Sequence, residues 1–228
     1  GLLGYIVRSA DLQQNRDIVF VPVGINYDRV LEDRTLTRSG RQVDGRISLT
    51  LSTLKYLFHN LWLAVTGRWY RNGYACVNFG SPISLREWKA SRPDTSSAAA
   101  WELQVEEFAG QMMDRVGEVI PILPVALVAS VFAHSEEPSL DLLTLKNRVF
   151  ELIADLETAG RHVYIPRGDL DYAVDVGIRM LVLRHVLKED DGMLSVAADE
   201  LTLLNYYAAS IEHLVAPLMH TGKETRST

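Results

Sequence analysis

The sequence contains one cysteine, Cys76, and no apolar run long enough to cross a membrane. A single thiol excludes an internal disulfide and a cysteine-rich zinc site, and it fits a reducing compartment. The sequence also has no glycine-rich phosphate loop, no Gly-x-Ser-x-Gly motif and no His-Glu-x-x-His motif. These absences exclude the common signatures of nucleotide-binding proteins, serine hydrolases and zinc proteases. The chain begins at Gly1 within an apolar segment, so we expect it to be a piece of a longer protein.

Positive charge is scarce in the second half of the chain. The whole sequence has 23 Lys and Arg against 29 Asp and Glu, a formal net charge of −6. Residues 139–215 alone hold 13 acidic and 7 basic residues, which is also a balance of −6. Nucleic-acid binding needs a basic contact surface, so we expect no nucleic-acid partner.

The 228 residues are 47% hydrophobic, enough to bury a core in one large domain or two small ones. Residues 17–30 read DIVFVPVGINYDRV. This continuous apolar run, followed by a polar cluster, predicts a strand buried on both faces within a helix-covered parallel sheet. Ligands of such sheets bind beyond the carboxyl ends of the strands, so the residues that follow the run are candidate binding residues. An ordinary core strand ending in a turn is the alternative.

Five arginines follow within eighteen residues, and no lysine lies among them: Arg29, Arg34, Arg38, Arg41 and Arg46. Guanidinium groups suit bidentate contacts to phosphate. The cluster could equally contact anionic lipid headgroups or the phosphates of an acyl carrier. Interspersed acidic residues leave a solvated loop as the other interpretation.

The rest of the chain alternates strand and helix signals and then becomes helical. We expect an amphipathic helix over residues 47–66, a strand over 74–79 that contains Cys76, and a turn-rich break at 91–97. Helices are predicted at 99–118, 122–133, 141–159, 170–187 and 198–218, with a hairpin at 190–192. The helix at 122–133 is hydrophobic on every side, so we expect it to be buried. Asp169 suits the start of a helix. The predicted domains are an α/β part at 1–90, a linker at 91–98, a mainly helical domain at 99–220 and a disordered tail at 221–228.

Three stretches together resemble a known family. They are VPVGINYDRV at 21–30, GYACVNFGSPISL at 73–85 and LLNYYAASIEHL at 203–214. The first resembles the fourth conserved block of the membrane-associated glycerol-3-phosphate 1-O-acyltransferases of bacteria, and the other two follow in the same order and spacing. The resemblance implies the end of an acyltransferase-type mixed α/β sheet followed by a mainly α-helical domain. The blocks with the catalytic His and Asp lie earlier in that family, so no catalytic residue is expected in this chain.

The resemblance also implies an activity and a set of binding residues. The family transfers a fatty acyl group from acyl-CoA or acyl carrier protein to the sn-1 hydroxyl of glycerol 3-phosphate in phospholipid synthesis, without a further cofactor. It implies a peripheral protein at the cytoplasmic face of the cell membrane, with the membrane surface as a partner. The substrate-binding residues would be Pro22, Gly24, Asn26, Tyr27, Asp28, Arg29 and Arg34.

Two further patterns occur in the second half of the chain. His185 and Asp190 match the His-x4-Asp spacing of acyltransferases, but they follow the fourth block and are rejected as a catalytic pair. Residues 139–215 have a helix-helix-hairpin-helix order, which is also compatible with a winged-helix-like regulatory module or a helical protein-interaction module without catalytic activity.

Overall fold

The computed structural model describes residues 1–10, 16–30, 33, 73–92 and 97–225, with side chains described as far as residue 218. The predicted helix at 47–66 and the arginines from Arg34 to Arg46 lie outside this part. The N-terminal elements are α1 (Leu2–Ser9), β1 (Val19–Phe20), β2 (Val23–Tyr27), β3 (Ala75–Phe79), β4 (Ile83–Ser84), α4 (Leu85–Ala90) and α5 (Ala98–Glu118). The C-terminal elements are α6 (Pro124–Ala133), β5 (Ser139–Asp141), α7 (Leu142–Thr158), η2 (Pro166–Gly168), α8 (Leu170–Leu183), β6 (Leu187–Asp190), β7 (Met193–Val196), α9 (Leu201–Ala209) and α10 (Glu212–Thr225).

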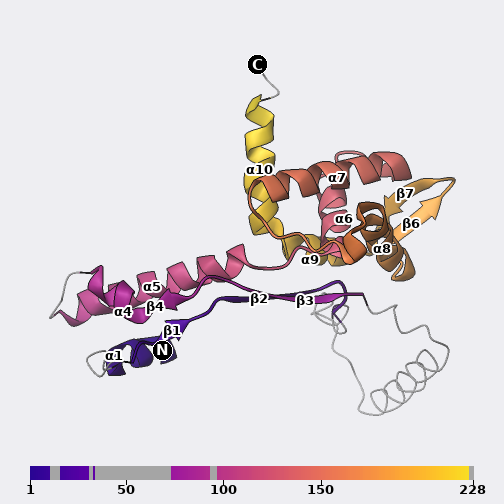
Figure 1. The fold of residues 1–228 in the computed structure, drawn as a ribbon. Coiled ribbons are helices and arrows are strands. Elements are labelled where there is room, and N and C mark those ends of the chain that lie inside the picture. Colours follow the sequence, from indigo (N-terminus) through magenta and orange to yellow (C-terminus); the bar gives the residue numbers. More distant parts are fainter. Residues whose placement is uncertain (11–15, 31–32, 34–72, 93–96, 226–228) are drawn as a thin grey trace, which may run out of the picture.

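A two-stranded ribbon of β2 and β3 runs beside α5 and joins the two ends of the molecule (Figure 1). The strands are antiparallel, with Val23 opposite Phe79 and Tyr27 opposite Ala75. β1 pairs with β4, also antiparallel, and Pro22 separates β1 from β2. The chain is therefore a mixture of helices and small antiparallel sheets.

The prediction that residues 17–30 form a strand buried on both faces within a parallel sheet is wrong for the described part of the chain. One face of the ribbon is apolar and exposed, and it carries Val23, Ile25, Tyr27, Val77 and Phe79. The other face packs on α5 and on the segment that joins α5 to α6. Consecutive strand residues point to opposite faces, so an apolar run shows that both faces suit burial. It does not show that both faces have a partner.

Side-chain caps fix where several helices begin. Ser84 accepts a hydrogen bond from the Glu87 amide, with Glu87 at the third helical position, as in a capping box. Asp141 caps α7 through the amides of Leu143 and Thr144. Asp169 accepts from the Tyr172 amide, so the predicted helix start is confirmed.

Helix α6 is the centre of the C-terminal core. Its residues are almost all buried, which confirms the prediction of a helix that is hydrophobic on every side. It packs against α7, α8 and α9. Gly177 of α8 lies so close that an added Cβ would come within 2.6 Å of the Pro124 carbonyl oxygen. The start of α6 is thus held directly against α8.

A three-stranded antiparallel sheet, in the order β5-β7-β6, flanks these helices. The predicted hairpin is confirmed, and its Asp191-Gly192 turn has φ values of 52° and 79°, as a two-residue type I′ turn requires. Two helix boundaries differ from prediction. α8 ends at Leu183, before β6, and the last predicted helix is two helices, α9 and α10, of which α10 continues to Thr225.

A second, smaller core lies at the other end of the molecule. It consists of Val7, Leu85, Trp88 and Phe108, and so unites α1, α4 and α5. The larger core begins at Ile122, just after α5. The change from one core to the other therefore falls at the end of α5. The linker predicted at 91–98 stays a prediction.

Candidate functional site

The inner face of the β2–β3 ribbon fits tightly against the segment that joins α5 to α6. Gly24 faces the backbone there, and a Cβ on it would lie 2.3 Å from the Val119 carbonyl oxygen. Asn26 donates from Nδ2 to the Pro121 carbonyl oxygen at 2.9 Å, and its Oδ1 accepts from the Tyr27 amide at 2.8 Å. These inner residues anchor the strand to the helical part.

Asp28 follows β2 directly and is completely buried. Its carboxylate accepts from the Tyr74 amide at 3.0 Å and from the Val125 amide at 3.0 Å. Val125 lies in the first turn of α6, whose own N-cap residue, Leu123, supplies no side-chain cap. Asp28 therefore caps α6 from a point 97 residues earlier in the chain, where a negative charge also suits the helix dipole.

Burial raises the pKa of Asp28 to about 6 from its ordinary value of 3.8, although the two backbone amides favour the charged form. Ionising Asp28 thus costs more in the folded than in the unfolded protein. The contribution of Asp28 to the free energy of unfolding should therefore be fully present below about pH 4 and should be lost, by up to about 3 kcal/mol, as the pH rises through 6. Urea titrations of the wild type and Asp28→Asn between pH 3.5 and 7.5 test this. If the difference in free energy of unfolding between the wild type and Asp28→Asn does not change with pH, the raised pKa of Asp28 is contradicted.

A second buried carboxylate, Asp33, connects the segment after β2 to two helices. It is 1% exposed. It pairs with Arg184, which follows α8, and accepts a hydrogen bond from the Tyr207 hydroxyl of α9. Burial, followed by the Asp33 contact, raises the pKa of Tyr207 above its ordinary value, so its hydroxyl remains a donor. The sequence alone does not predict this cluster. The available signals were an acidic residue shortly after an apolar strand and a tyrosine on an apolar helix.

The structure divides the predicted substrate-binding residues into two groups. Pro22, Gly24 and Asp28 are buried, and Asn26 is engaged with the helical part. Tyr27 is 48% exposed and Arg29 is half-buried. Tyr27 and Arg29 are therefore more accessible than Pro22, Gly24 and Asp28. Arg34 lies outside the described residues. The binding roles stay predictions.

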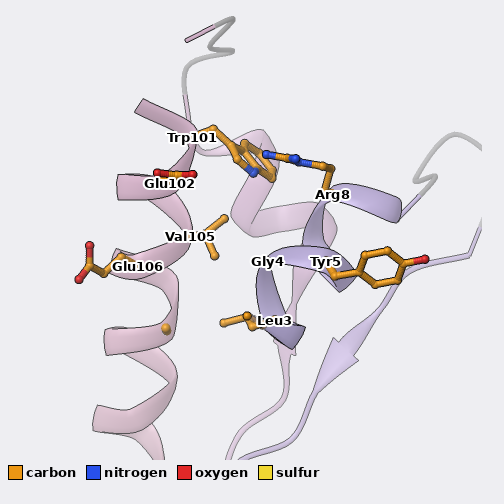
Figure 2. A pocket seen from close by; sticks show the side chains of 10 residues that line it. Leu3, Gly4, Tyr5, Arg8, Trp101, Glu102, Val105 and Glu106 are labelled. Atoms are coloured by element: carbon orange, nitrogen blue, oxygen red, sulfur yellow. The ribbon is translucent and has the colours of Figure 1, made fainter. Parts of the chain in front are cut away.

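A cavity of about 570 Å³ lies between α1 and α5. Figure 2 shows Arg8 extending from α1 toward Trp101, while Tyr5 and Glu106 point away from the gap between the helices. The polar side chains that line this cavity therefore do not converge on one point. Another cavity, of about 620 Å³, lies beside Gly73 and Tyr74, next to the end of β2.

The described residues contain no group of three or more His, Cys, Asp or Glu side chains that could hold a metal ion. Cys76 is half-buried, and burial, with a smaller contribution from the charge of Asp28, raises the pKa of its thiol. A thiol with a raised pKa is a poor nucleophile at neutral pH. Cys76 therefore serves as a packing residue on the inner side of β3.

Comparison with known proteins gives a consistent result. A family model described as the glycerol-3-phosphate acyltransferase C-terminal region matches residues 60–219. The glycerol-3-phosphate acyltransferase of Pseudomonas fluorescens (strain SBW25) is 28% identical over 238 residues, which cover 95% of this chain and 26% of the relative. The enzyme of that name from Pseudomonas syringae pv. syringae (strain B728a) is 25% identical over 228 residues, with the same coverage. The chain thus spans about a quarter of the length of these curated relatives.

Proposed function

The chain belongs to the glycerol-3-phosphate acyltransferase family, to its C-terminal region, and we propose that it works as part of an enzyme that acylates the sn-1 hydroxyl of glycerol 3-phosphate. The acyl donor would be acyl-CoA or acyl carrier protein, and the product would enter phospholipid synthesis. The acceptor oxygen forms the new ester bond as the carbon–sulfur bond of the thioester breaks. The hydroxyl proton ends on the departing thiol.

One observation carries this proposal: relatives named as this acyltransferase match 95% of the chain. Such a transfer needs a base for the acceptor hydroxyl and donors for the developing oxyanion. We assign the base and its acidic partner to another part of the enzyme. The outer apolar face of the β2–β3 ribbon is a surface that the remaining three quarters of such an enzyme could bury.

The role of this chain in the reaction would be to form one wall of the acceptor site. Asp28 and Asp33 fix the segment after β2 from both sides, on α6 and on α8 and α9. That rigidity places Tyr27 and Arg29 at the strand end, where Arg29 can bind the phosphate of glycerol 3-phosphate. We propose a peripheral position at the cytoplasmic face of the membrane. No helix in the described ranges is long and apolar enough to span a bilayer.

Acyl transfer by the full-length protein tests the proposal. Arg29→Ala should raise KM for glycerol 3-phosphate about tenfold or more, because a charge-assisted phosphate contact is lost. Tyr27→Ala should also lower kcat/KM for glycerol 3-phosphate. Arg115→Ala is the matched control, since Arg115 is an exposed arginine on α5 that pairs with Glu118. Unchanged kinetics in both site variants would refute the assignment of the acceptor site. The isolated 228-residue chain should be inactive.

A second candidate function rests on the order α6-β5-α7-α8-β6-β7, which is that of a winged helix. The hairpin of β6 and β7 would be the wing. Its exposed residues include Glu189, Asp190 and Asp191, and this acidity disfavours DNA. A regulatory or protein-binding role remains compatible with the topology. Retention of the chain on DNA at moderate salt would favour this second function over the first.

A further inference from the structure

The cavity beside Tyr74 is built from one stripe of α8 and the start of β3. Tyr172, Val176, Arg179, Met180 and Leu183 follow helical spacing along α8 and form one wall. Gly73, Tyr74 and Arg167 also line the cavity. The opposite side of α8 packs into the main core. The cavity measures about 620 Å³, within the range of small-molecule sites.

The charge of this cavity is opposite to that of the chain. Two arginines line it, and its described lining residues include no acid. The nearby carboxylates are engaged elsewhere. Asp171 and Asp175 both pair with Lys146 of α7 at 3.0 Å. Asp169 caps α8, and Asp28 binds two backbone amides. The described lining of the cavity therefore carries two positive charges and no negative one, in a chain with a net charge of −6.

Arg167 is held in an unusual conformation at the rim. Its φ of 61° lies in the left-handed region, which is strained for a non-glycine residue. Pro166 precedes it, and Gly168, with φ of 67°, follows. Its guanidinium lies 4.1 Å from the centre of the Tyr172 ring, a cation–π contact that holds the side chain against the cavity wall.

The tyrosines add hydrogen-bonding capacity. Burial raises the pKa of Tyr74 to about 12, and a hydrogen bond with the Tyr172 side chain adds to the effect. The Tyr74 hydroxyl therefore remains protonated at neutral pH. The two rings also give the cavity an aromatic wall beside its two guanidinium groups, which suits a ligand with both an anionic group and an organic body.

We propose that this cavity binds the phosphate group of a small organic phosphate, with Arg167 and Arg179 as its ligands. Guanidinium groups bind phosphate oxygens bidentately. Two sources of that group suit a protein of this family: glycerol 3-phosphate and the phosphates of coenzyme A. The described lining of the cavity does not include Arg29. The choice of these two sources rests on the proposed function, but the test requires no acyl transfer, so failure of the site and failure of the activity are distinguishable.

Calorimetric titration of the 228-residue chain tests the site. Glycerol 3-phosphate, coenzyme A and inorganic phosphate are titrated separately, so that the result distinguishes the two sources. At least one of the two organic phosphates should bind. Arg167→Gln and Arg179→Gln should each weaken binding about tenfold or more. Arg115→Gln, on the exposed surface of α5, should leave it unchanged. Absence of binding by both organic phosphates, or wild-type affinity in both cavity variants, would overturn the proposal.

A second measurement does not depend on the folding of variants. In the wild-type chain, the organic phosphate that binds should shift the amide NMR signals of residues 73–74 and 167–183. Shifts confined to the Arg29 region would assign phosphate binding to the strand end and would refute this cavity as the site. Equal affinity of inorganic phosphate and both organic phosphates would refute the contact between the ligand body and the tyrosine wall.

Discussion

Replacing Asp33 by alanine should lower the free energy of unfolding by about 3–5 kcal/mol. The substitution removes the carboxylate that pairs with Arg184, whose side chain is only 11% exposed. Breaking a buried ion pair by removing one of its two charges costs about 3–5 kcal/mol in other proteins. The Tyr207 hydroxyl loses its acceptor at the same time. Urea unfolding followed by tryptophan fluorescence measures the change.

Two further variants make the Asp33 experiment specific. Tyr207→Phe removes only the hydroxyl and should cost about 1–2 kcal/mol. The double variant should cost less than the sum of the two single changes, because both alter one cluster. Asp114→Asn, at an exposed position on α5, should change stability by less than about 0.5 kcal/mol. A loss below about 1 kcal/mol for Asp33→Ala would show that the cluster does not hold the strand end in place.

Gly24→Ala should destabilise the protein by about 3 kcal/mol, the upper end of the usual cost of overpacking. The added methyl group would lie 2.3 Å from the Val119 carbonyl oxygen and 2.8 Å from Ile120 Cα. These are backbone atoms and cannot turn aside, so the ribbon must shift from the helical part. In the full-length enzyme the same shift should displace Tyr27 and Arg29 and reduce acyl transfer. Thermal unfolding and the activity assay report the two effects separately.

Gly110→Ala is the matched control for Gly24. Gly110 lies inside α5, and no other atom lies within 4 Å of its added Cβ. Alanine favours helix over glycine by up to about 1 kcal/mol, so this variant should be as stable as the wild type or slightly more stable. If both glycine variants behave alike, the close approach of β2 to the segment after α5 is not a determinant of the fold.

The sequence by itself determined the local features. The Asp191-Gly192 turn, the cap at Asp169 and the all-round burial of α6 were predicted, and the structure confirms them. Each depends on residues within a few positions of one another, where backbone preference and side-chain hydrogen bonding act almost independently of the rest of the chain. The motif at residues 21–30 likewise predicted the family.

Only the tertiary structure decided how the strand end is built. Asp28 reaches Val125 across 97 residues, and Asp33 reaches Tyr207 across 174. The sequence marks these acids as polar residues after an apolar strand, which equally describes ligand-binding and structural carboxylates. Their roles depend on which amides, guanidinium groups and hydroxyls the fold brings to them. The same holds for Arg167 and Arg179, which share a cavity because α8 lies beside the start of β3. Local preferences cannot specify such contacts, since they exist only once distant segments have packed together.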